Sequence, residues 1–168
     1  MKQMEKAIGY LKEGWALPKS ATHRGKETFF KLACSFKEIA PLDKVINPSK
    51  IPGDLLEFWH LCDGATLFAD NEYGQWGLEI WGSREAIKKT ETAYYERPKE
   101  FNNGDLIIGR FIGDSDLLVI RCDKQKKDYG SILIALPIDQ RKDWPVVATD
   151  FAAFLEMYSH YEGDKYWE

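Results

Sequence analysis

The stretch that decides the fold runs from Asp105 to Leu136 and reads DLIIGRFIGDSDLLVIRCDKQKKDYGSILIAL. It contains three apolar runs, 105–112, 117–122 and 131–136, whose content of Ile, Leu and Val is typical of β-strands. Polar links of four and eight residues separate these runs. Because short links join neighbouring antiparallel strands, we expect the three runs to pair as a β-meander.

Helices are predicted on both sides of this meander. Apolar residues at a spacing of about 3.6 predict helices over 26–40 and 51–62, and Pro52 suits the first turn of the second. A third helix is predicted from an N-cap at Ser83 to about residue 96. A last helix is predicted to follow a cap at Asp150.

Two further strands are predicted before the third helix. One covers 66–69, and the other covers 76–81, where Trp76, Leu78 and Ile80 alternate with Glu79 and Trp81. The order of elements indicates an α+β fold with a mixed, largely antiparallel sheet flanked by helices.

We expect a single domain over residues 26–160. Residues 1–25 are expected to be an irregular N-terminal extension with a short helix near 4–12, and residues 161–168 a mainly polar C-terminal tail. No internal repeat is visible, and the length suits one hydrophobic core.

The amino-acid composition limits which classes of molecule the protein is expected to bind. The net charge of −4 disfavours direct binding of nucleic acid, which needs a concentrated positive surface. Neither a signal peptide nor a membrane span is apparent, and Cys34, Cys62 and Cys122 lie far apart. We therefore expect a cytoplasmic protein with reduced thiols and no membrane contact.

Known catalytic motifs are not found, so we predict that the protein is not an enzyme and uses no cofactor or metal. His60 and Cys62 are two apart on a predicted helix, so they point to different faces. Asp114 and Asp116 suggest a tight turn whose carboxylates cap backbone N–H groups. The alternative is a metal-dependent hydrolase or nucleotide-binding enzyme that uses these two residues with Asp123.

A binding surface for a basic protein is the function that these residues favour. Acidic residues with aromatic neighbours could anchor such a partner. The candidates are Asp70, Glu72, Tyr73, Trp76, Glu79, Trp81, Asp114, Asp116 and Asp123. Glu79 and Trp81 share the face of their strand that we favour for contact. The alternative is ordinary surface acids and core tryptophans. Arg121 and the lysines at 124, 126 and 127 are expected to form a basic hairpin tip.

Three segments together are similar to the motifs of one family. Ile51-Pro52 starts a helix that leads to Asp63-Gly64, Ile112-Gly113 precedes an acidic loop and a strand, and Thr149-Asp150-Phe151 precedes Phe154-Leu155. In this order and spacing, they resemble the SMI1/KNR4 family, also called the SUKH superfamily, over about residues 26–158.

The resemblance implies an α+β sheet with helices packed around it. Many bacterial members resemble immunity proteins, which neutralise polymorphic or contact-dependent toxins, frequently nucleases. Fungal members are linked to control of cell-wall synthesis. We therefore predict a protein-binding immunity protein that occludes a cognate toxin domain. The alternative is a regulatory or scaffold module linked to cell-envelope synthesis or signalling.

Overall fold

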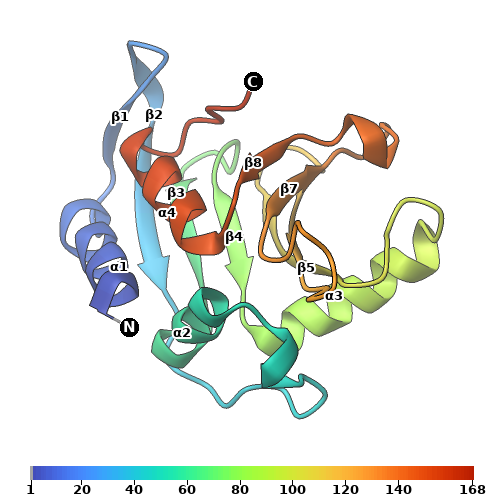
Figure 1. The fold of residues 1–168 in the computed structure, drawn as a ribbon. Helices are drawn as coiled ribbons and strands as arrows, with labels where there is room; N and C mark the ends of the chain where they lie inside the picture. Colours follow the sequence, from blue (N-terminus) through green and yellow to red (C-terminus); the bar gives the residue numbers. More distant parts are fainter. Residues whose placement is uncertain (1) are drawn as a thin grey trace.

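The computed structural model describes residues 2–168, over which four α-helices accompany one eight-stranded sheet (Figure 1). The helices are α1 (Lys2–Trp15), α2 (Gly53–Leu61), α3 (Ser83–Glu96) and α4 (Phe151–His160). The strands are β1 (Lys19–His23), β2 (Lys26–Phe36), β3 (Gly64–Asp70), β4 (Leu78–Trp81), β5 (Asp105–Phe111), β6 (Leu117–Arg121), β7 (Ile132–Ala135) and β8 (Val146–Ala148). Two 3₁₀ turns, η1 (Pro48–Lys50) and η2 (Arg141–Asp143), lie in the connections.

The strands lie side by side in the order of the sequence, and every neighbouring pair is antiparallel. The predicted meander is confirmed, because Ile107 pairs with Val119 and Val119 pairs with Leu133. The α+β class is confirmed as well. Among the described strands the sheet is wholly antiparallel, where we had allowed for a mixed one.

One face of the sheet forms the main core with α1, α2 and α4. Residues paired across an antiparallel ladder share a face, so Leu67, Leu78 and Phe111 lie together, and all three are buried. The Phe111 ring lies 6.3 Å from the ring of Tyr158 on α4. The Phe68 ring lies 4.9 Å from Trp15 at the end of α1. Burying each large apolar side chain here contributes about 1.5–3 kcal/mol.

The opposite face is only half covered. α3 packs on β5, where the backbone N–H of Ile107 donates to the Thr90 hydroxyl at 2.9 Å. Away from α3, a row of paired residues crosses the sheet from Ser35 through Glu79 to Arg110. These side chains are exposed or half-buried, so this part of the sheet meets solvent.

The predicted helix over 26–40 is wrong, because residues 26–36 form strand β2. β2 lies between β1 and β3, and pairing with both outweighs the local apolar spacing. The strand alternation places Leu32 inside, whereas Phe29 is 87% exposed.

The helix predicted near residues 4–12 is confirmed, but the rest of the N-terminal segment is not irregular. α1 runs from Lys2 to Trp15 and buries Met4, Ile8 and Leu11, and β1 follows it. The expected boundary at residue 25 falls in the turn of the β1–β2 hairpin. Elements on both sides of it contribute to one core.

The other predicted helices are confirmed, with one change at a cap. Asp150 caps α4, because its side chain accepts a hydrogen bond from the Ala153 N–H at 2.7 Å. α3 begins at Ser83, but its N-cap is Gly82. The buried Ser83 hydroxyl instead accepts from the backbone N–H of Asp43 at 2.8 Å.

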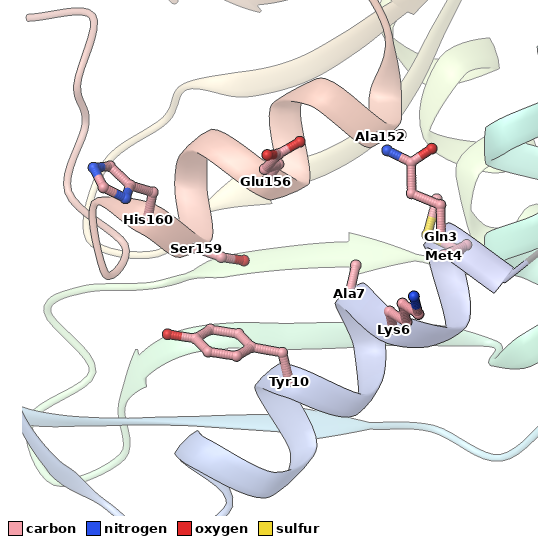
Figure 2. A pocket seen from close by; sticks show the side chains of 9 residues that line it. All are labelled: Gln3, Met4, Lys6, Ala7, Tyr10, Ala152, Glu156, Ser159 and His160. Atoms are coloured by element: carbon pink, nitrogen blue, oxygen red, sulfur yellow. The ribbon is translucent and has the colours of Figure 1, made fainter.

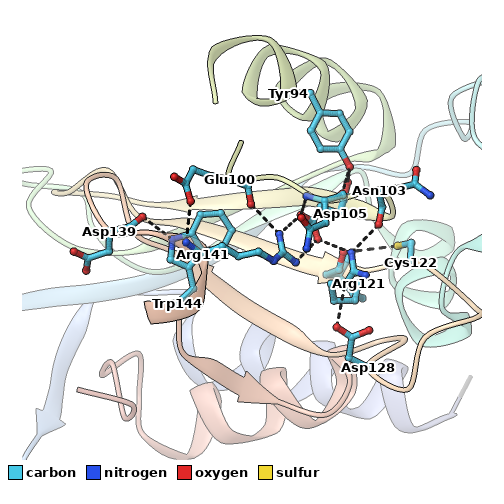
Figure 3. A network of polar contacts seen from close by, with 12 residues as sticks. Tyr94, Glu100, Asn103, Asp105, Arg121, Cys122, Asp128, Asp139, Arg141 and Trp144 are labelled. Carbon is cyan, nitrogen blue, oxygen red and sulfur yellow. Dashed lines mark hydrogen bonds and ion pairs between the residues drawn. The ribbon is translucent and has the colours of Figure 1, made fainter. Parts of the chain in front are cut away.

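A buried ion network joins β5, β6 and η2 (Figure 3). The Asp105 carboxylate is 0% exposed and accepts from Arg121 Nη1 at 2.7 Å and from both Nη atoms of Arg141. Arg121 also donates through Nε to Asp128 at 3.0 Å. The expectation that Arg121 is a surface cation is therefore wrong. Of the four cations expected at that tip, the three lysines are exposed and Arg121 is buried.

Candidate functional site

Four segments meet at one end of the sheet, which we call the acidic end. They are the tip of the β1–β2 hairpin (22–28), the β3–β4 loop (70–76), the β5–β6 turn (112–116) and the C-terminal segment (161–168). The backbone N–H of Ile112 donates at 2.8 Å to the carbonyl of Gly77, which directly follows the β3–β4 loop, so the two central segments lie side by side. Gly113 has a φ of +97°, and a Cβ there would collide with the carbonyl oxygen of Gln75.

The C-terminal segment holds this end together rather than forming a free polar tail. The indole N–H of Trp76 donates to the Gly163 carbonyl at 2.9 Å, and His23 Nε2 lies 2.9 Å from the Glu162 carbonyl oxygen. Further along, the Tyr166 hydroxyl donates to the Val147 carbonyl at 2.7 Å. The segment therefore links β1, the β3–β4 loop and β8.

Lys165 forms an ion pair with both predicted residues, Asp114 and Asp116. The Lys165 side chain is 7% exposed, and its ammonium hydrogen-bonds to Asp114 and lies 3.3 Å from Asp116 Oδ2. Burial raises the pKa of Asp116, and the charge of Asp114 adds to the rise, although Lys165 opposes it. Burial alone would lower the pKa of Lys165, but its bonds to both aspartates outweigh this and leave its pKa raised. The Asp116 N–H also donates to Asp114 Oδ1, so the predicted turn is present.

Asp70 shapes the loop that presents Tyr73. The Asp70 carboxylate is buried and accepts from the backbone N–H groups of Glu72 and Tyr73, each at 3.0 Å, and of Gln75 at 3.2 Å. These bonds fold the loop back on itself and leave Tyr73 54% exposed. Asp70 therefore fixes the shape of this loop, and Glu72 and Tyr73 lie exposed on its surface.

An exposed aromatic patch lies beside this loop. The rings of Phe29 and Phe30 lie 6.4 and 6.0 Å from the Tyr73 ring. A groove of about 250 Å³ adjoins the patch. Its lining residues are His23, Lys26, Glu27, Thr28, Phe29, Phe30, Leu32 and Trp76. The sequence reasoning missed Phe29 and Phe30, because the helical interpretation placed Phe29 in the core. Two adjacent phenylalanines after Thr28 were the available signal for a strand.

The acidic end holds the surplus negative charge of the molecule. Its four segments contain eight carboxylate side chains and three cationic ones, with His23 counted as neutral, a net charge of −5. The whole chain has a net charge of −4, so all other residues together carry +1. A concentrated negative field of this kind steers basic partners toward one surface.

The remaining predicted residues do not join the acidic end. Glu79 lies on the open sheet face, where its carboxylate pairs with Arg110 Nε at 2.8 Å and accepts from the Trp81 indole N–H at 3.0 Å. Trp81 does share that face, but it is only 4% exposed, and Lys89 of α3 lies over its ring. Its ring is thus not available at the surface.

Asp123 lies beyond one end of β6, and Asp114 and Asp116 lie beyond the other; the five residues of β6 alone span about 17 Å at 3.3–3.4 Å per residue. Its carboxylate accepts from the Gln125 N–H at 3.1 Å. The three aspartates of the hydrolase alternative therefore do not converge. Among the described residues, no group of three or more His, Cys, Asp or Glu side chains could hold a metal ion.

A second groove, of about 440 Å³, runs between α1 and α4 (Figure 2). Tyr10 reaches into it from α1, and Glu156 and His160 project from α4. These side chains are exposed, whereas the acidic end is fixed by buried hydrogen bonds and an ion pair. We therefore assign the candidate site to the acidic end.

Comparison with protein families finds that the model of the SMI1 / KNR4 family (SUKH-1) matches residues 33–157. Comparison with curated proteins gives no match. The matched region contains the β3–β4 loop and the β5–β6 turn, while Phe29, Phe30 and the C-terminal segment lie outside it. No described helix has the length and apolar content needed to cross a membrane.

Proposed function

The chain belongs to the SMI1/KNR4 family (SUKH-1), and from this premise we propose that it is an immunity-type protein. It binds a cognate toxin domain as a folded protein and occludes the surface on which the toxin acts. No covalent step is required of the immunity protein, because tight stoichiometric binding is sufficient to exclude the toxin's substrate.

The observation that carries this proposal is the exposed aromatic patch at the border of the acidic end. Phe29 and Tyr73 are large apolar side chains that are mostly exposed, at 87% and 54%, and their rings lie close together. Aromatic side chains that desolvate in the middle of an interface supply much of its binding energy. The surrounding carboxylates suit a basic partner surface, such as the groove in which a nuclease holds its phosphate backbone.

Co-expression tests the proposal. The chain is produced together with the toxin domain encoded by the adjacent gene, and the mixture is analysed by gel filtration. We expect a stable stoichiometric complex and restored growth of cells that express the toxin. Tyr73→Ala should weaken the complex by about tenfold or more, because it removes a central aromatic contact.

Tyr95→Ala is the matched control. Tyr95 is also exposed, at 87%, but it lies on α3, away from the acidic end. This variant should bind as the parent does. The absence of any complex together with unrelieved toxicity would overturn the proposal. Weak, salt-sensitive capture of several proteins would instead favour the regulatory or scaffold module linked to cell-envelope synthesis or signalling.

A further inference from the structure

Strand β2 is longer than the strand beside it. It contains 11 residues, but only Leu32 to Phe36 pair with β3. On one side, Lys26, Glu27 and Lys31 pair with His23, Thr22 and Ser20 of β1, and a register shift between the last two of these pairs marks an irregularity at residues 28–30. On the other side no described strand pairs with them, and Figure 1 shows this hairpin projecting beyond the rest of the sheet. Such an edge presents unpaired backbone N–H and C=O groups to a new strand.

The side chains along this edge are arranged for contact. Phe29 stands on it at 87% exposure, with Lys31 also exposed. The groove of about 250 Å³ is lined by Phe29 and, among others, by Trp76. Trp76 is held in place by the Gly163 carbonyl, so the groove has one rigid wall. An added strand therefore finds backbone partners and a recess for one apolar side chain in the same place.

The negative charge around the edge of β2 determines which kind of segment binds there. The acidic end surrounds this edge with a net charge of −5, so a second copy of the chain would bring like charges together. The edge itself carries Lys26, Glu27 and Lys31, so the attraction for a basic segment comes from the carboxylates around the edge and not from the residues on it. An extended, positively charged segment is attracted by the surrounding negative field. A neutral or acidic segment is not.

We infer that the free edge of β2 takes an extended, basic segment of the partner protein as an added antiparallel or parallel strand. An apolar side chain of that segment fills the groove beside Phe29. That the segment belongs to a toxin domain rests on the function proposed above. The edge itself is defined by the pairing of β2 and by the exposure of Phe29.

A short peptide tests the edge without the toxin. The probe alternates threonine and lysine around a central leucine, and its counterpart has glutamate in place of lysine. Binding to the ¹⁵N-labelled chain is followed by amide chemical shifts. We expect the lysine peptide to shift the amides of residues 26–31, less so at high salt, and the glutamate peptide to leave them unchanged.

Two matched variants sharpen the test. Phe29→Lys should weaken peptide binding by about tenfold or more, and Ile138→Lys, at a residue 94% exposed in the loop between β7 and β8, should not. Absent shifts at 26–31, or equal binding of both peptides, would overturn the inference. A toxin complex in which hydrogen exchange leaves these amides unprotected would overturn it too, while the proposed function would stand. If the peptide binds at the edge but no toxin complex forms, the proposed function fails and the edge assignment stands.

Discussion

Replacing Asp105 with alanine should destabilise the protein more than any other change of a single carboxylate in the ion network of Figure 3. Asp105 accepts from two guanidinium groups and from the backbone N–H of Asn102 at 2.7 Å. Its side chain is 0% exposed, and that of Arg121 is 5% exposed. Without Asp105, the Arg121 charge remains buried and keeps only its bonds to Asp128 and to the Asn103 carbonyl.

Removing one partner of a buried ion pair typically costs about 3–5 kcal/mol. Arg141 is 19% exposed, so water can solvate part of its charge, and most of the cost arises at Arg121. A loss of this size lowers the melting temperature of a domain this long by about 6–20 °C, at roughly 2–4 °C per kcal/mol. It is a large part of a total stability of about 5–15 kcal/mol.

Urea unfolding followed by tryptophan fluorescence measures this loss at neutral pH. Asp123→Ala is the matched control, because Asp123 is a partly exposed aspartate near the same strands whose carboxylate bonds locally to Gln125. We expect the control to change the free energy of unfolding by less than about 1 kcal/mol. The reasoning is refuted if Asp105→Ala costs no more than the control.

Three further predictions follow from buried groups. The Tyr158 hydroxyl is buried with no hydrogen-bond partner among the described residues, so Tyr158→Phe should stabilise the protein by about 1 kcal/mol in the same urea assay; a clear loss would reveal an unrecognised partner. Burial raises the pKa of Cys34 and of Cys122 to about 12, so these thiols should react with a disulfide reagent at pH 8 far more slowly in the folded protein than in urea, and equal rates would contradict this. Because the pKa of Asp116 is raised above its unfolded value, its contribution to stability is fully present only below the unfolded pKa and is lost as pH rises through the folded one. Asp116→Asn should therefore be more stable than the parent at pH 7, with the difference shrinking in acid, and an advantage that grows in acid would show the opposite sign.

The sequence predicted the elements whose signals are local. Asp150 lies next to the helix it caps, and the meander is joined by short polar links. β2 was missed because its identity depends on pairing with β1 and β3, and the β3 partner Asp70 is far away in sequence. Its apolar residues also fit a helical period, so periodicity alone did not discriminate between the two structures.

Part of the candidate site was predictable for the same reason. Glu72, Tyr73 and Trp76 come from one loop, so a local cluster in the sequence is also a cluster in space. The pairing of Lys165 with Asp114 joins residues 51 apart, and nothing in either segment indicates it. The burial of Trp81 likewise depends on how α3 packs, because Lys89 of α3 lies over the Trp81 ring. The residues next to Trp81 in the sequence do not indicate this contact. Long-range contacts thus decided which of the predicted acids and aromatics reach the surface.

The positions of these features along β5 separate stability from binding. Asp105 and its arginines lie at the start of β5, and the β5–β6 turn of the acidic end follows its last residue, Phe111, about 20 Å away. Changes at sites this far apart with no shared partner usually add. Phe29→Lys should therefore impair binding in a protein that unfolds normally, and Asp105→Ala should lower stability in a protein that binds normally while it remains folded. If Phe29→Lys instead lowers stability as much as Asp105→Ala does, Phe29 is part of the folding core, and the exposed patch is not available as a binding surface.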